Sequence, residues 1–68
     1  MYLATYDTQH YTFRAIGSNK RRLVQRMTEA WERHCQQTGA DRDYFKPDEI
    51  EIAEMTPNVV YRDGFALL

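Results

Sequence analysis

The sequence predicts an α+β fold in a single domain spanning residues 1–68, with the element order β-β-α-β-β. One amphipathic helix is expected to pack across a small, mainly antiparallel sheet. Three observations predict this fold: alternating apolar and polar positions near the N-terminus, one long segment of helical periodicity, and a second alternating segment after it. A chain this short buries roughly 60% of its unfolded surface, so we expect it to need a partner or a second copy of itself.

Residues 2–16 predict a β-hairpin. One set of side chains repeats with the period of two that is typical of strands; it comprises Tyr2, Ala4, Tyr6, Tyr11, Phe13 and Ala15. The polar sequence DTQH separates the two halves and is short enough to require antiparallel pairing. Gly17 is expected to end the second strand.

Residues 19–37 predict the helix. Ser18 or Asn19 is expected to cap its start, because either side chain offers an oxygen to unpaired backbone N–H groups. Gly39 is expected to end it in the left-handed conformation. At about 100° per residue the less polar side chains form one stripe; they are Leu23, Val24, Met27, Ala30, Trp31, His34 and Cys35. Such a stripe is typical of a helix packed on a sheet.

A third strand is predicted at residues 49–55. Ile50 and Ile52 alternate there with glutamates, which predicts a half-buried strand with an acidic outer face. Tyr44 and Phe45 interrupt the polar connection between helix and strand. We expect these two aromatic side chains to fold back onto the core.

A short fourth strand is predicted at residues 59–62. The dipeptide Asp63-Gly64 then predicts a turn before the apolar sequence FALL. A single helix covers only one face of the sheet that these strands form. We therefore expect dimerisation or partner binding to cover the other face, and a homodimer is one possibility.

The net charge of −1 conceals a segregation of charge along the chain. Residues 1–40 carry six basic and three acidic side chains, a net of +3, whereas residues 41–68 carry three basic and seven acidic ones, a net of −4. Such asymmetry steers a charged partner or favours self-association. The isoelectric point near 6.0 and the acidic second half disfavour a nucleic-acid duplex as the partner.

The expected location is the cytoplasm of a bacterial host. Cys35 is the single cysteine, so it has no internal disulfide partner, which fits a reducing compartment. No apolar run approaches the roughly 20 residues that span a bilayer, and no basic-then-apolar leader precedes the first strand. We therefore expect no membrane association.

The start of the helix carries three consecutive cations, Lys20, Arg21 and Arg22. Cations are unfavourable there because the helix N-terminus carries partial positive charge. Further along, Arg26 and Arg33 lie within about 40° of Arg22 on the helical wheel, opposite the apolar stripe.

A solvated helix face is the alternative to a binding surface. Glu29 is spaced to pair with both Arg26 and Arg33, which would explain these two arginines. The run that begins at Lys20 has no acidic neighbour along the helix, although the acidic strand face could neutralise Arg22. The residues expected to contact a partner are Lys20, Arg21, Arg22, Arg26 and Arg33, or the acidic residues Glu49, Glu51 and Glu54.

No catalytic, metal or cofactor site is expected. Cys35 and His34 are adjacent and so point about 100° apart on a helix, and His10 is the one other histidine, which is too few ligands for zinc. The aspartates after the helix lack the glycine and the terminal glutamate of a calcium loop. The sequence also lacks a glycine-rich phosphate loop and a nucleophile elbow. We expect a protein that is not an enzyme.

Parts of the sequence resemble two groups of known proteins. The segments YLATYDTQHYTFRAIG, AWERHCQQTGAD and YRDG resemble short uncharacterised proteins carried by bacterial phages, plasmids and integrated elements. The hairpin followed by AIGSNKRRLVQRMTEAW is similar in layout to the N-terminal part of HicB-type antitoxins, although no third strand precedes the helix here. The first resemblance implies a protein of a phage or another mobile element. Small size, the lack of a catalytic constellation, the segregated charge and the partly uncovered sheet predict a module that occupies a surface of a larger host or phage protein, for example as an anti-CRISPR inhibitor of a defence system. The alternative is a nucleic-acid-binding or antitoxin-like regulator that uses the helix arginines.

Overall fold

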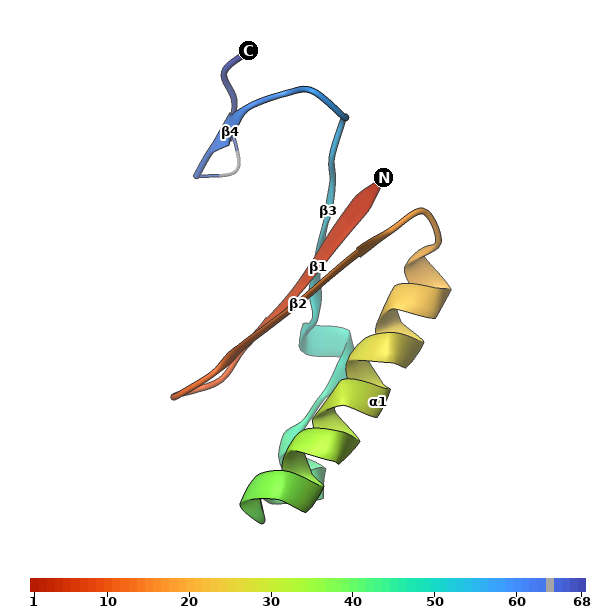
Figure 1. The fold of residues 1–68 in the computed structure, drawn as a ribbon, viewed down its shortest axis with the longest axis vertical. Coiled ribbons are helices and arrows are strands. Elements are labelled where there is room, and N and C mark those ends of the chain that lie inside the picture. The colour runs from red at the N-terminus through yellow and green to blue at the C-terminus, as the bar shows by residue number, and fades with distance from the viewer. Residues whose placement is uncertain (64) are drawn as a thin grey trace.

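A three-stranded antiparallel sheet carries one long helix on one of its faces (Figure 1). The computed structural model describes residues 1–63 and 65–68. The sheet order is β2-β1-β3, in which β1 spans Tyr2–Asp7, β2 spans Thr12–Gly17 and β3 spans Glu51–Glu54. Helix α1 spans Lys20–Thr38. The predicted α+β class, with a single amphipathic helix across a small antiparallel sheet, is confirmed.

The central strand β1 pairs with both of its neighbours in register. Ala4 lies opposite Ala15 of β2 and Ile52 of β3, whereas Leu3 lies opposite Ile16 and Ala53. Because successive side chains of a strand point to opposite faces, these two rows lie on opposite faces of the sheet. The Ala4 row faces α1, and the Leu3 row lies on the face that α1 leaves open.

The helix begins and ends as its sequence predicts. The side-chain oxygen of Asn19 accepts a hydrogen bond of 3.1 Å from the backbone N–H of Arg22, so Asn19 is the cap rather than Ser18. Gly39 has φ of 75°, and its N–H donates to the carbonyl of Cys35 at 2.8 Å. Local backbone chemistry therefore sets both ends of α1.

The core lies between α1 and the sheet. Ala4 and Tyr6 of β1 pack with Leu23 and Met27 of α1, all with exposed fractions of 5% or less. The helical stripe differs from its prediction at Ala30, which is exposed. The stripe is centred near Met27, so the short alanine side chain at its edge does not reach the sheet.

An aromatic group closes one end of the core. The Trp31 ring stacks on Tyr44 and Phe45, with centroids 5.8 and 5.7 Å away, and Phe45 also contacts Tyr6 at 4.7 Å. The Trp31 indole N–H donates to the backbone carbonyl of Arg42 at 3.3 Å. The two connection aromatics do fold back, through a 3-10 turn at Arg42–Tyr44.

The third strand is shorter than the predicted 49–55. A second 3-10 turn occupies Pro47–Glu49, where the N–H of Glu49 donates to the carbonyl of Lys46 at 2.9 Å. Proline is favoured at the first position of such a turn because its φ is preset. Glu49 consequently precedes the strand, and it does not share a strand face with Glu51 as the alternation predicts.

The chain ends in a separate two-stranded ribbon. The predicted strand 59–62 is reduced to β4, Tyr61–Arg62, which pairs with β5, Phe65–Ala66, instead of extending the sheet. The left-handed backbone of Asn58, with φ of 66°, turns the chain just before it. The predicted turn includes Gly64, which lies outside the described residues.

The ribbon lies on the side of the sheet away from α1 and makes the molecule elongated (Figure 1). Its principal extents are 42 × 23 × 19 Å. The radius of gyration is 13.2 Å, whereas a compact domain of this length would have roughly 11 Å.

Candidate partner-binding surface

Lys20 is exposed, but its side chain contacts the ring of Tyr2. As the first residue of α1 it lies in line with the buried stripe, and its ammonium nitrogen is 5.0 Å from the centroid of the Tyr2 ring. A cation over an aromatic face is stabilised by the ring quadrupole. This contact gives Lys20 a structural role and removes it from the free basic residues.

Arg21 and Arg22 are both exposed and point in different directions. Adjacent helical residues diverge by about 100°, so Arg21 lies on the flank of α1 away from Arg22. Within residues 1–63 and 65–68, neither guanidinium has an ion pair or a side-chain hydrogen bond. The three-residue basic run is therefore not one patch.

A shallow groove runs along the Arg22 flank of α1. Its first part lies beside the end of β2, and its lining residues are Ile16, Gly17, Ser18, Asn19, Arg22, Leu23 and Arg26. Its second part continues along the helix and is lined by Arg26, Glu29, Ala30 and Arg33. Arg26 lines both parts. We call this surface the basic groove.

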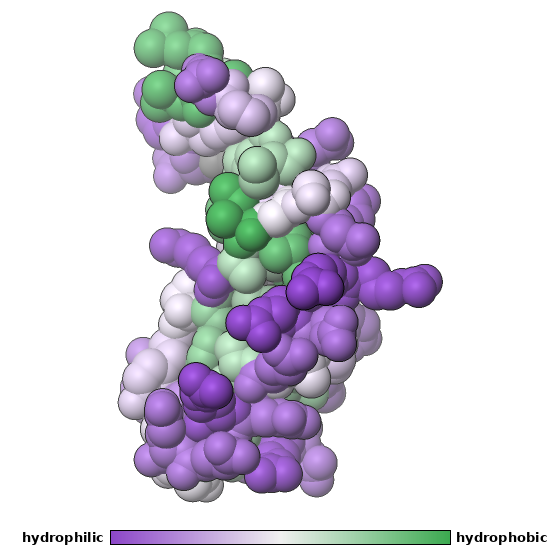
Figure 2. Space-filling view, turned by 45° about the vertical axis from the view of Figure 1, so that its right-hand side comes forward, coloured by the Kyte–Doolittle hydropathy of each residue, from purple (hydrophilic) through white to green (hydrophobic). Residues whose placement is uncertain are grey.

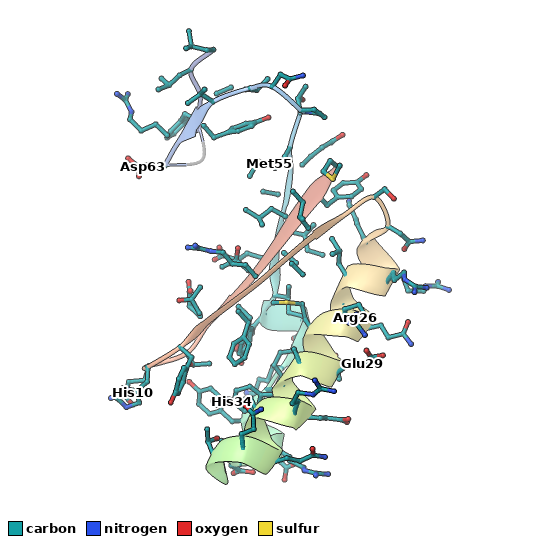
Figure 3. All side chains as sticks on the ribbon, viewed as in Figure 1. His10, Arg26, Glu29, His34, Met55 and Asp63 are labelled. Atoms are coloured by element: carbon teal, nitrogen blue, oxygen red, sulfur yellow. The ribbon has the colours of Figure 1, made fainter. Side chains whose placement is uncertain are left out.

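Charge in the basic groove is only partly neutralised. Arg26 and Glu29 form an ion pair of 2.5 Å, and both project from the side of α1 that faces away from the sheet (Figure 3). Glu29 does not pair with Arg33, which has no ion pair within the described part of the chain. Surface pairs of this kind contribute little stability. Because Arg22 and Arg33 have no ion pair among the described residues, their guanidinium groups can bind an anionic group of a partner.

The acidic candidates lie at the opposite edge of the sheet. Glu49 and Glu51 line a small depression together with Asp7, Thr5 and Tyr6. Glu54 lies apart from this set, because a three-residue separation along β3 places it on the other face from Glu51. The strand order β2-β1-β3 separates the acidic edge from α1, so these carboxylates do not neutralise Arg22.

The His34 and Cys35 pair is part of the packing. His34 is half-buried, with its ring 4.7 Å from Tyr11 and 5.2 Å from Trp31, and Cys35 is buried and has a free thiol. His10 lies at the tip of the β1–β2 hairpin (Figure 3). Across residues 1–63 and 65–68, histidine, cysteine, aspartate and glutamate side chains form no cluster of three or more suited to a metal ion.

Sequence reasoning missed three contributors to these surfaces. Ala30 and Ile16 line the basic groove, and Asp7 joins the acidic depression. Asp7 and Glu51 are far apart in sequence, and only the pairing of β1 with β3 brings them together. The position of Ala30 on the helical wheel, next to Arg26 and Arg33, is the signal that could have placed it in the groove rather than the core.

Apolar side chains gather on the C-terminal ribbon, whereas hydrophilic side chains cover much of the α1 side (Figure 2). The exposed apolar residues of the ribbon region are Val60, Phe65, Leu67 and Leu68. No helix among the described residues is long and apolar enough to cross a membrane. No protein-family model, curated protein or solved structure matches this chain.

Proposed function

We propose that this protein is a small non-enzymatic module that binds an acidic surface of a larger protein through the basic groove. The observation that carries the proposal is the row Arg22, Arg26 and Arg33 along α1, in which Arg22 and Arg33 lack ion-pair partners in the described chain. Guanidinium groups bind carboxylates through paired hydrogen bonds. Glu29 offsets only one of the three charges.

The form of the groove supports a macromolecular partner. Small-molecule sites are concave cavities that enclose most of their ligand, whereas the basic groove is a shallow depression along the helix. The end of β2, at Ile16 and Gly17, borders its first part, and β2 is an edge strand of the sheet. An edge strand offers unpaired backbone groups to an extended partner segment, so arginines and strand edge can act together.

A biological setting consistent with this activity is a phage or another mobile element of bacteria. In that setting the module would occupy a functional surface of a host or phage protein, and inhibition of a defence complex in the manner of an anti-CRISPR protein is one form. Size and charge support this role, because a chain of 68 residues with a basic flank can cover a surface of another protein without any catalytic activity.

Nucleic-acid binding, including an antitoxin-like regulatory role, is the alternative, because the same arginines are suited to phosphates. Stacking of bases on tyrosines would favour it. However, Tyr2 lies beneath Lys20, and the hydroxyl of Tyr61 accepts a hydrogen bond of 2.8 Å from the backbone N–H of Thr56. Tyr11 packs against His34, with ring centroids 4.7 Å apart. None of these three rings lines the basic groove, which favours a protein partner.

The test compares two variants of equal charge. Arg22→Glu with Arg33→Glu alters the groove, and Arg42→Glu with Arg62→Glu makes the same charge change outside it. Immobilised wild type and the second variant are expected to retain the same stoichiometric partner from bacterial lysate at low salt. The groove variant is expected to bind it about 100-fold more weakly, since charge-assisted hydrogen bonds are lost.

Circular dichroism would show that all three proteins fold. Equal retention by both variants would contradict the proposal. A salt-dependent shift of labelled DNA or RNA that the groove variant alone abolishes would establish the nucleic-acid alternative instead.

A further inference from the structure

The face of the sheet that α1 leaves open has an ordered pattern of side chains. Its apolar row is Ile16, Leu3 and Ala53, taken across β2, β1 and β3. Leu3 is half-buried, and Ile16 is 66% exposed. Together the three side chains form a small apolar strip on an uncovered sheet face, and association would remove this strip from water.

The adjacent row on the same face carries charge of opposite sign at its two ends. Thr5 of β1 lies between Arg14 of β2 and Glu51 of β3. Strands are spaced about 4.8 Å apart, so Arg14 and Glu51 lie two strand spacings apart and form no ion pair with one another. Each charge is therefore available to a group that approaches this face from outside.

We propose that a second copy of this chain covers the open face in a two-fold symmetric dimer. A two-fold axis parallel to β1, lying between two facing sheets, exchanges the two edges of the sheet without reversing the strands. It places Arg14 of one copy opposite Glu51 of the other, and the reverse, so two ion pairs form. The same operation places Leu3 against the partner's Leu3 and Ile16 against the partner's Ala53.

Charge pairing distinguishes this dimer from the other two-fold arrangement of facing sheets. A two-fold axis perpendicular to the strands would place Arg14 near the partner's Arg14 and Glu51 near the partner's Glu51. Like charges across an interface cost several kcal/mol, whereas complementary ones set the register. The row Arg14, Thr5 and Glu51 therefore favours the parallel axis by two ion pairs, set against one like-charge approach of Asp7 to the partner's Asp7 at the exposed end of β1.

The sheet face alone is too small for a stable dimer. β1 and β2 have six residues each and β3 has four, so the sheet face presents roughly 260 Å², against about 800 Å² per partner in a standard interface. The ribbon β4–β5 stands on the side of the sheet away from α1 (Figure 1), which is the side on which the second copy would sit. Its exposed residues, Phe65 at 73% and Leu68 at 85%, add apolar area on the ribbon that a partner can cover.

The test uses complementary charge reversals and is independent of the basic groove. Sedimentation equilibrium of the wild type is expected to show a dimer. Arg14→Glu alone sets two carboxylates against each other at each cross-pair, and Glu51→Arg alone sets two guanidinium groups together. Each single variant is therefore expected to dissociate about 100-fold more readily. In a heterodimer of the two variants, each cross-pair joins a carboxylate of one copy to a guanidinium group of the other. An equimolar mixture is therefore expected to dimerise about as well as the wild type.

Two further variants serve as controls for folding and for the position of the charge reversal. The double variant Arg14→Glu with Glu51→Arg is expected to dimerise again, which shows that the reversed side chains permit folding. Arg42→Glu, a charge reversal in the 3-10 turn after α1, is expected to dimerise like the wild type. A wild type that stays monomeric at millimolar concentration, or a dimer that neither single reversal weakens, would overturn the proposal.

Discussion

The ammonium group of Lys20 lies 5.0 Å from the centroid of the Tyr2 ring, so the first residue of α1 is held over the first residue of β1. Two effects oppose one another at Lys20. The positive end of the helix dipole disfavours a cation there by about 0.3–1 kcal/mol, whereas an exposed cation–π contact contributes about 0.5–1 kcal/mol. The contact with Tyr2 explains why a lysine is tolerated at this end of the helix.

Replacing Lys20 by methionine is therefore expected to change the free energy of unfolding by less than about 0.5 kcal/mol, because the two effects nearly cancel. Urea unfolding of Lys20→Met, Tyr2→Leu and the double variant forms a double-mutant cycle. The cycle is expected to give a coupling of about 0.5 kcal/mol. A coupling of zero would mean that the ring does not stabilise the cation.

Asn19→Ala is expected to lower the free energy of unfolding by about 1 kcal/mol, because the backbone N–H of Arg22 loses its side-chain acceptor. Asn19→Asp retains the acceptor and adds a favourable charge at the helix start. Ser18→Ala is the matched control and is expected to have little effect. Equal losses at both positions would show that the cap is not specific to Asn19.

Gly39→Ala is expected to destabilise the protein by about 1–2 kcal/mol, since φ of 75° is costly for a residue with a Cβ. An added Cβ would meet no atom within 4 Å, so the whole cost arises from the backbone. Gly39→Asn is expected to recover part of it, because asparagine tolerates the left-handed region. Thermal unfolding would measure the order Gly, Asn, Ala, and alanine equal to asparagine would contradict this account.

Trp31→Ala is expected to unfold most of the protein at 25 °C. The side chain is 5% exposed and contacts Tyr44, Phe45 and the carbonyl of Arg42. Truncation of a buried tryptophan costs about 3–5 kcal/mol, which is comparable to the total stability of a domain this small. Far-ultraviolet circular dichroism would report the loss.

Glu32→Ala is the neighbouring control for Trp31. Its side chain is exposed, and a surface substitution of this kind changes stability by about 0.5 kcal/mol or less. A folded Trp31→Ala protein with unchanged stability would show that the aromatic group is not part of the core.

The helix was predictable because its signals are local. Asn19, Gly39 and the spacing of Leu23, Met27 and Trp31 lie within a few turns of one another. The error at Ala30 has a physical origin: hydropathy assigns alanine to the stripe, but packing depends on whether a side chain is long enough to reach the sheet.

The candidate surfaces were less predictable because they depend on strand order. Residue types alone do not indicate that β3 pairs with β1 and leaves β2 at the edge. That pairing brings Asp7 to Glu51 and places Arg14 and Glu51 at the two ends of one row. The shortening of the third strand was more predictable, because Pro47 is a local signal for a turn.

The ribbon β4–β5 is joined to the sheet through a single connecting segment, and its own backbone bonds, such as that from Leu67 to Val60 at 2.7 Å, are internal to it. Local opening of such a unit does not require the core between α1 and the sheet to open. In the isolated chain, amide protons should therefore exchange in two classes, with those of β1 the most protected and those of the ribbon much less so. The molecule thus contains two cooperative units of unequal stability, and any partner that covers the ribbon would be detected first as slower exchange at Leu67.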